Sequence, residues 1–122
     1  MKQSITIRPA YSQVVICDPT AKVEVPLWER NVGFVASDTC ILFGCYPEPD
    51  GPTDLTFGTG DEVRGDGPPT CELVLKTPGR QIAVEGVEGD GIFSMMTKAT
   101  ETRVRIWANR NWLPDKVIIG ID

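Results

Sequence analysis

Short runs of apolar residues, many of them β-branched, recur along the whole chain and are separated by Gly, Pro, Asn and Asp. This pattern is typical of β-strands bounded by turns. No stretch carries a 3.6-residue apolar repeat long enough for a helix, and the nearest candidate, 26–31, would make one turn at most. The predicted strands cover residues 4–8, 13–17, 21–25, 33–36, 40–46, 54–57, 71–77, 80–85, 91–96, 102–108 and 116–121.

About ten short strands with little helix predict an all-β fold, either a β-sandwich or a partly open antiparallel β-barrel. The chain of 122 residues is long enough for one core, so we expect a single β-domain over residues 1–122. Pro78 and Gly79 predict a type II turn that joins 72–76 to 81–85 as a hairpin. The expected core contains Ile5, Val15, Ile41, Phe43, Leu73, Leu75, Ile82, Val84, Val104, Ile106 and Ile118.

The composition excludes several kinds of chemistry. The chain contains no His, so the common imidazole bases and His metal ligands are excluded. A net charge of −5 and a pI near 4.7 argue against binding to nucleic acid, which needs Lys and Arg to neutralise phosphates. A basic protein is the more plausible partner, and we expect a protein that is not an enzyme.

Cysteine usage and the start of the chain bear on the compartment. The four cysteines, Cys17, Cys40, Cys45 and Cys71, form no CxxC pair, so a zinc site has little support. We expect them to be reduced, buried thiols, with Cys40 and Cys45 on opposite faces of their strand because their spacing is odd. The first residues lack the apolar stretch of a secretory signal, and no segment is long enough to span a bilayer. The expected location is therefore cytoplasmic, away from membranes.

Acidic residues concentrate in the middle of the chain. Residues 48–90 hold ten acidic and three basic side chains, and most of the acids fall in Gly-rich loops. Three interpretations remain open for these loops: ordinary turn chemistry, a patch that faces a basic partner, or a bound metal. The loops do not match the calcium-binding pattern, and 58–62 lacks the Lys of a phosphate-binding loop. We therefore expect no metal and no cofactor.

The aromatic residues near the end of the chain are a second candidate feature. Trp107 and Trp112 bracket a short loop that contains Arg110. If Val104 and Ile106 point inward, alternation along the strand places Trp107 on the outward face. Trp107 is then either exposed, placed at a strand bend, or used to close the core at the end of the sheet. Trp and Arg are also the residues that dominate binding energy at protein interfaces.

Several strand and turn segments occur in an order that is similar to that of a known family. They are Ser4-Ile5-Thr6-Ile7, Tyr11-Ser12-Gln13-Val14-Val15-Ile16, Trp28, Gly33-Phe34-Val35-Ala36, the strand 40–46, Gly91-Ile92-Phe93-Ser94, Arg103-Val104-Arg105-Ile106-Trp107 and the strand 116–121. This order resembles the competence protein J family, whose members are small cytosolic inhibitors of the DNA-entry nuclease. The similarity is spread over most of the chain and implies a β-fold, a nuclease partner and no catalysis.

This resemblance agrees with the charge pattern, because an inhibitor can present carboxylates to the basic cleft where a nuclease binds phosphates. Two alternatives stay open: a structural or assembly β-module of a phage or secretion system, which would form homo-oligomers through exposed strand edges, and a small enzyme that uses carboxylates alone. The expected partner-binding residues are Asp61, Glu62, Asp66, Glu85, Glu88, Asp90, Trp107, Arg110 and Trp112.

Overall fold

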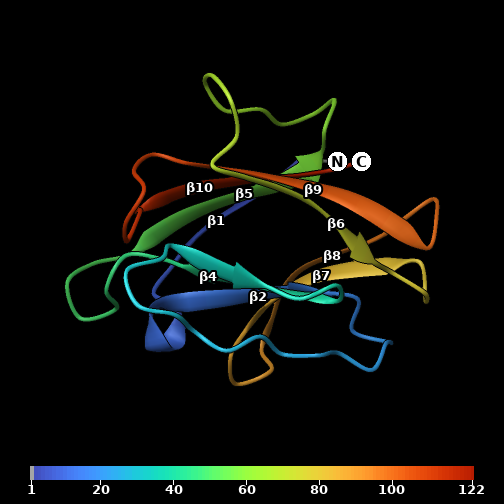
Figure 1. Ribbon diagram of the computed structural model, residues 1–122. Coiled ribbons are helices and arrows are strands. Elements are labelled where there is room, and N and C mark those ends of the chain that lie inside the picture. The colour runs from blue at the N-terminus through green and yellow to red at the C-terminus, as the bar shows by residue number, and fades with distance from the viewer. Residues whose placement is uncertain (1) are drawn as a thin grey trace.

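The computed structural model describes residues 2–122, whose ten strands form two facing sheets (Figure 1). Helical structure in this part of the chain is confined to the short 3₁₀ turn Ala10–Ser12. None of the described helical structure is long and apolar enough to cross a membrane. The strands are β1 (Gln3–Ile7), β2 (Gln13–Cys17), β3 (Phe34–Ala36), β4 (Cys40–Gly44), β5 (Thr53–Thr59), β6 (Cys71–Lys76), β7 (Gln81–Gly86), β8 (Gly91–Met96), β9 (Glu101–Ala108) and β10 (Lys116–Ile121).

The first sheet has the strand order β1-β5-β10-β9-β6, and the second has the order β3-β4-β2-β7-β8. Strand β10 runs parallel to β5 and antiparallel to β9, so it lies at the centre of the first sheet. The other strand pairs are antiparallel. The predicted all-β, sandwich-like fold is confirmed.

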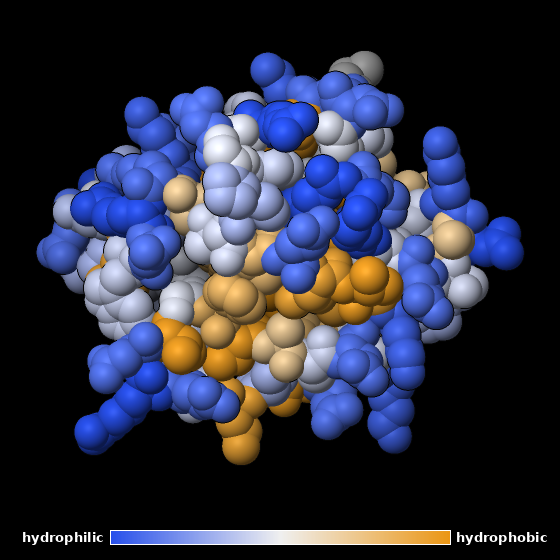
Figure 2. Space-filling model, turned by 45° about the horizontal axis from the view of Figure 1, so that its top comes forward, coloured by the Kyte–Doolittle hydropathy of each residue, from blue (hydrophilic) through white to orange (hydrophobic). Residues whose placement is uncertain are grey.

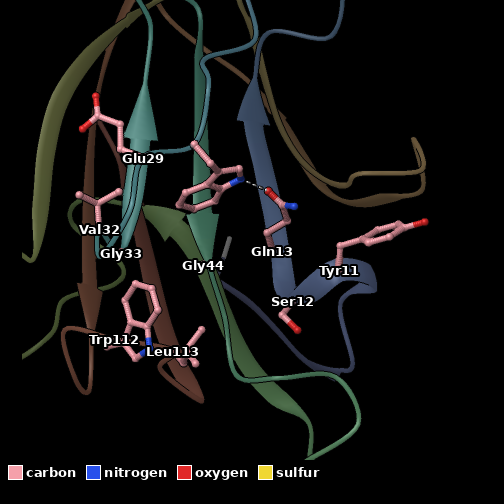
Figure 3. Close-up of a pocket in the computed structure, with 10 residues that line it drawn as sticks. Tyr11, Ser12, Gln13, Glu29, Val32, Gly33, Gly44, Trp112 and Leu113 are labelled. Atoms are coloured by element: carbon pink, nitrogen blue, oxygen red, sulfur yellow. Dashed lines mark hydrogen bonds between the residues drawn. The ribbon is translucent and has the colours of Figure 1, made fainter.

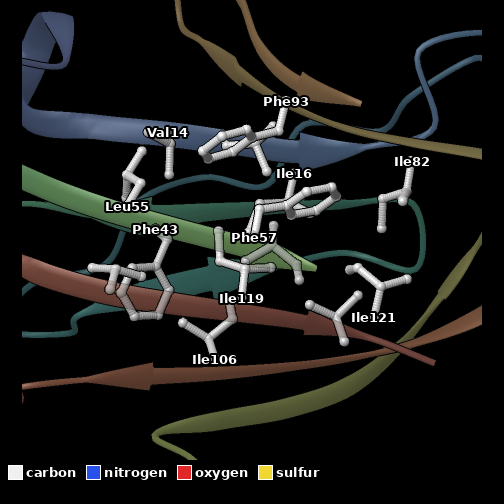
Figure 4. Packing of buried hydrophobic residues seen from close by; sticks show 14 of the residues in the cluster. Val14, Ile16, Phe43, Leu55, Phe57, Ile82, Phe93, Ile106, Ile119 and Ile121 are labelled. Carbon is white, nitrogen blue, oxygen red and sulfur yellow. The ribbon is translucent and has the colours of Figure 1, made fainter. Parts of the chain in front are cut away.

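The core lies between the two sheets and is built from alternate residues of the strands (Figure 4). In β9, for example, Val104 and Ile106 are fully buried, whereas Arg103 and Arg105 lie on the other face. Phe57 of the first sheet stacks on Phe93 of the second, with ring centroids 5.2 Å apart. Burial of such large side chains contributes most of the stabilisation that holds the sheets together.

Seven of the eleven predicted core residues are buried, and three predictions were wrong. Ile5 pairs with the buried Leu55 and so lies on the core-facing side of the sheet, but β1 is an edge strand and leaves its side chain 39% exposed. Val15 and Ile118 lie on the outer faces of their sheets, while the neighbouring positions of β2 and β10 fill the core. Both strands are apolar on the two faces, so alternation could not set their orientation. Leu73 is partly buried and packs against the core.

Two local predictions also need correction. Residues 21–25 form no strand, because the backbone there bonds to side chains: the Glu24 N–H donates to Thr39 Oγ1 at 2.8 Å. The turn at 77–80 is not of type II, since Arg80 rather than Gly79 has the positive φ, 55°. It does not close a hairpin either, because the chain passes there from β6 of the first sheet to β7 of the second.

Candidate partner-binding surfaces

The loop between β5 and β6 (residues 60–70) folds over the outer face of the first sheet and presents exposed carboxylates (Figure 1). Asp61 and Asp66 are exposed and form no ion pair within the described residues. Glu62 accepts hydrogen bonds from the Thr59 N–H and hydroxyl group, each at 3.1 Å. Buried Val63 anchors the same turn. The acidic side chains therefore project from a loop of defined shape.

Trp107 holds this loop in place. Its side chain points outward from the first sheet, as the alternation predicted, but the loop covers it, so of the alternatives left open for Trp107 the exposed one does not apply. Its Nε1–H donates to the Gly67 carbonyl oxygen at 3.1 Å. A Cβ atom on Gly65 would lie 2.3 Å from Trp107 Cγ, so the loop backbone packs directly on the indole ring. Trp107 thus supports the acidic loop and is not itself accessible to a partner.

The second acidic group lies on the second sheet. Glu85 stands on its outer face, where its carboxylate accepts a weak hydrogen bond from the Cys17 thiol at 3.8 Å. Glu88 and Asp90 are exposed in the β7–β8 loop, which Gly89 allows to turn with a φ of 86°. In Figure 1 this loop and the β5–β6 loop project from opposite sides of the sandwich. The structure therefore does not bring the two predicted acidic groups together.

The β9–β10 loop carries the remaining two predicted residues. Arg110 lies over the ring of Tyr46, 5.1 Å from its centroid, and forms an ion pair with Asp115 at 3.4 Å. The hydrogen bond from Asn109 lowers the pKa of Asp115, and Arg110 adds to this effect. Trp112 is 52% exposed. These contacts fix the loop and leave the Trp112 ring at the surface.

Trp112 borders a hollow of about 220 Å³, the aromatic cleft, which sequence reasoning missed (Figure 3). Tyr11, Trp28 and Leu113 line it as well. Trp28 Nε1–H donates to Gln13 Oε1 at 2.7 Å, the bond drawn as a dashed line in Figure 3. One usable signal was present in the sequence, an apolar stretch at 25–28 that the structure leaves outside the strands. Nothing in the sequence pairs Trp28 with Trp112.

The backbone around the aromatic cleft is strained. Three of the five described non-Gly residues with positive φ line it: Tyr11 (58°), Ser12 (57°) and Leu113 (48°). Each such residue costs about 1–3 kcal/mol and persists only where its surroundings hold it. Residues of this kind cluster at ligand-binding and functional sites, which marks the cleft as a candidate site.

A larger hollow of about 550 Å³, the apolar groove, adjoins the aromatic cleft on the outer face of the second sheet. The two share Gln13 and Trp28. Val15 and Leu42 form part of the groove, and Leu27 stands beside it with 89% of its surface exposed. On the face that Figure 2 shows, hydrophilic side chains dominate the upper half and hydrophobic ones gather across the lower centre.

The described side chains include no group of three or more Cys, Asp and Glu residues placed to hold a metal ion. Each of the two hollows on the second-sheet side is lined by a single carboxylate, Glu29 in the cleft and Glu85 in the groove. Glycosidase-type chemistry needs two carboxylates on either side of one bond. Neither hollow has such a pair among the described residues that line it.

Comparison with known proteins supports the fold. No protein-family model and no curated protein matches the sequence. The structure is similar to the crystal structure of ComJ from Bacillus subtilis, an inhibitor of the DNA-degrading activity of NucA. The TM-score is 0.70 and the sequence identity 13%, over 98% of this chain and 93% of that chain. The resemblance to the competence protein J family is thus confirmed at the level of the fold.

Proposed function

We propose that this protein is a non-catalytic inhibitor that binds a nuclease and blocks its access to DNA. The observation that carries the proposal is the shared fold, which extends over almost the whole chain to a protein that inhibits a DNA-degrading nuclease. The exposed carboxylates of the β5–β6 and β7–β8 loops supply the complementary chemistry. A nuclease binds a polyanion at a basic surface, and such a surface attracts exposed carboxylates as it attracts phosphates.

The acidic loops suit this role because several of their carboxylates form no ion pair among the residues that the structure describes. On the first sheet, Arg105 pairs with Glu72 at 3.6 Å and with Asp122 at 2.5 Å, so those acids are already compensated. Asp66 and Glu88 form no such pair within the described residues. The negative field of the molecule therefore originates from its loops and would steer a basic partner toward them.

The test measures inhibition of DNA degradation by the basic nuclease encoded nearest to this protein's gene. Reversing Asp61 and Asp66 to Lys should slow association several-fold and weaken its salt dependence, with a smaller effect on dissociation. Glu62 is left unchanged because it caps the Thr59 turn. The matched control reverses Asp50 and Glu101, two exposed acids outside these loops, and changes the net charge equally.

Three results would count against the proposal. If the protein binds no such nuclease, the inhibitor function fails, and a homo-oligomer would instead favour the structural or assembly β-module. If the loop and control variants slow association equally, only net charge matters. If the loop variant associates like wild type at every salt concentration, the β5–β6 acids belong to ordinary turn chemistry.

A further inference from the structure

The outer face of the second sheet carries an unusual set of exposed apolar side chains. Trp28 stands where the aromatic cleft and the apolar groove meet, with 40% of its surface exposed. Leu27 beside it is 89% exposed and Trp112 across the cleft 52%. Scattered exposed apolar residues are normal, whereas a group of large ones around two joined hollows indicates an interaction site. We name this region, formed by Tyr11, Val15, Leu27, Trp28, Leu42 and Trp112, the Trp28 surface.

Contacts within the protein hold Trp28 and the segment that follows it in place. The bond to Gln13 fixes the Trp28 indole, as Figure 3 shows. The segment that follows is fixed to β4, because the Gly44 N–H donates to the Gly33 carbonyl oxygen at 2.9 Å. A Cβ atom on Gly33 would lie 2.7 Å from the Asn111 carbonyl oxygen, so the β9–β10 loop also packs closely on this segment. A preorganised aromatic side chain loses little entropy on binding, which is what makes Trp a frequent hot spot.

The charges around the surface define the partner. The described residues that line the two hollows include the carboxylates of Glu29 and Glu85 but no Lys or Arg. Val87 and Gly89 of the β7–β8 loop line the groove, and the exposed Glu88 lies between them in the chain. An apolar centre with an acidic rim is complementary to an apolar side chain with basic neighbours.

We propose that the Trp28 surface anchors a partner segment in which a large apolar side chain is flanked by Lys or Arg. The apolar side chain enters the hollow beside Trp28, and the flanking cations face Glu29, Glu85 and Glu88. This docking site deepens the proposed function. Its assignment to a nuclease partner rests on that function. It also assigns the main contact to the second sheet, so that the β5–β6 loop on the opposite side contributes only long-range steering.

The first experiment needs no nuclease. A phage-displayed library of random 12-residue peptides is panned on the full chain, and the enriched peptides are synthesised and titrated by fluorescence polarisation. They should combine a large apolar residue with Lys or Arg, and Trp28→Ala should weaken their binding by about tenfold or more. Leu27→Ser, at a position too exposed to affect folding, should also weaken it. Val74→Ala, an exposed apolar change on the first sheet, should have no effect.

Failure to enrich any peptide, or enrichment of peptides that lack basic residues, would overturn the inference. Equal binding by wild type, Trp28→Ala and Leu27→Ser would overturn it as well. The second experiment repeats the nuclease assay with these variants and with the peptide as a competitor. If wild type inhibits no nuclease but the peptides bind through Trp28, the proposed function fails and the surface stands. If wild type inhibits and both variants inhibit equally well, the nuclease contact lies elsewhere and the inference is wrong.

Discussion

Asp18 directly follows β2, and its carboxylate is fully buried. Its hydrogen bonds join the segment after β2 to the turn between β6 and β7. Oδ1 accepts bonds from the Thr20 N–H and hydroxyl group at 2.8 and 2.7 Å. Oδ2 accepts one from the Gly79 N–H at 2.7 Å. Burial acts to raise the pKa of Asp18, but the hydrogen bonds outweigh it and hold the pKa below its ordinary value. The carboxylate thereby fixes the turn that carries the chain between the sheets.

Replacing Asp18 by Asn should therefore destabilise the protein by about 1–3 kcal/mol at neutral pH, since an amide cannot accept all three bonds. Because the folded-state pKa is depressed, this stabilisation is present above the unfolded pKa, near 4, and is lost as pH falls through the folded value. Urea unfolding between pH 7 and pH 2 should show the two proteins converging at low pH. Asp50→Asn, at an exposed site, is the control. A gap that stays constant over this range would contradict the assigned role.

The four cysteines are all buried, as the sequence predicted. Cys45 belongs to the core, whereas Cys17 and Cys40 face each other across β2 and β4. Burial raises the pKa of Cys17 and Cys71 to about 12 and that of Cys40 to about 11. A thiol with so high a pKa holds almost no thiolate at neutral pH and is a poor nucleophile.

Titration of thiols with a disulfide reagent at neutral pH should accordingly be slow in the native protein and reach four groups only in denaturant. Cys17 should react first of the four, because it lines the apolar groove. Mass mapping of a partly labelled sample identifies the reacting residue. Immediate labelling of all four thiols without denaturant would show that the strands open far more readily than their packing indicates.

At the scale of elements, the β5–β6 loop depends on the contact between Gly65 and Trp107. A methyl group at Gly65 would overlap the indole ring, so Gly65→Ala should destabilise the protein by about 1–3 kcal/mol and loosen the loop. Gly91→Ala is the matched control: its Cβ would meet open space, and the expected change is under about 0.5 kcal/mol. Urea unfolding followed by Trp fluorescence measures both. Equal stability of the two variants would show that the loop shifts without cost.

Strand positions could be read from the sequence because β-branched runs and turn residues are local signals. Which face of a strand points to the core could be predicted only where the other face is polar. This prediction was correct for Ile106 and wrong for Val15 and Ile118. The turn after β6 was placed correctly, but local turn chemistry does not determine which sheet the next strand joins. The acidic loops were also visible in the sequence. The aromatic cleft was not, because Tyr11, Trp28 and Trp112 meet only after both sheets have formed.

At the scale of the whole molecule, the sandwich separates charge from apolar contact area. The β5–β6 loop presents Asp61 and Asp66 on the first-sheet side, while the joined hollows around Trp28 lie on the second-sheet side, next to Glu88. Electrostatic attraction between exposed charges extends over about 8–10 Å at physiological ionic strength, whereas attraction between apolar side chains requires direct contact. The two sides therefore suit different stages of one association: encounter guided by the whole field, then docking on the second sheet.

The fold depends on pairing the last strand with the middle of the chain. Strand β10 lies between β5 and β9, and its Val117, Ile119 and Ile121 side chains are part of the core. Removing residues 116–122 would leave two strands without partners and open the core, so we expect no cooperative unfolding transition and no near-UV circular dichroism signal. Removing residues 2–7 takes away only the edge strand β1, so a cooperative transition should survive at lower urea concentration. A 116–122 deletion that still unfolds cooperatively would show that the second sheet and the rest of the first form a stable unit without their central strand.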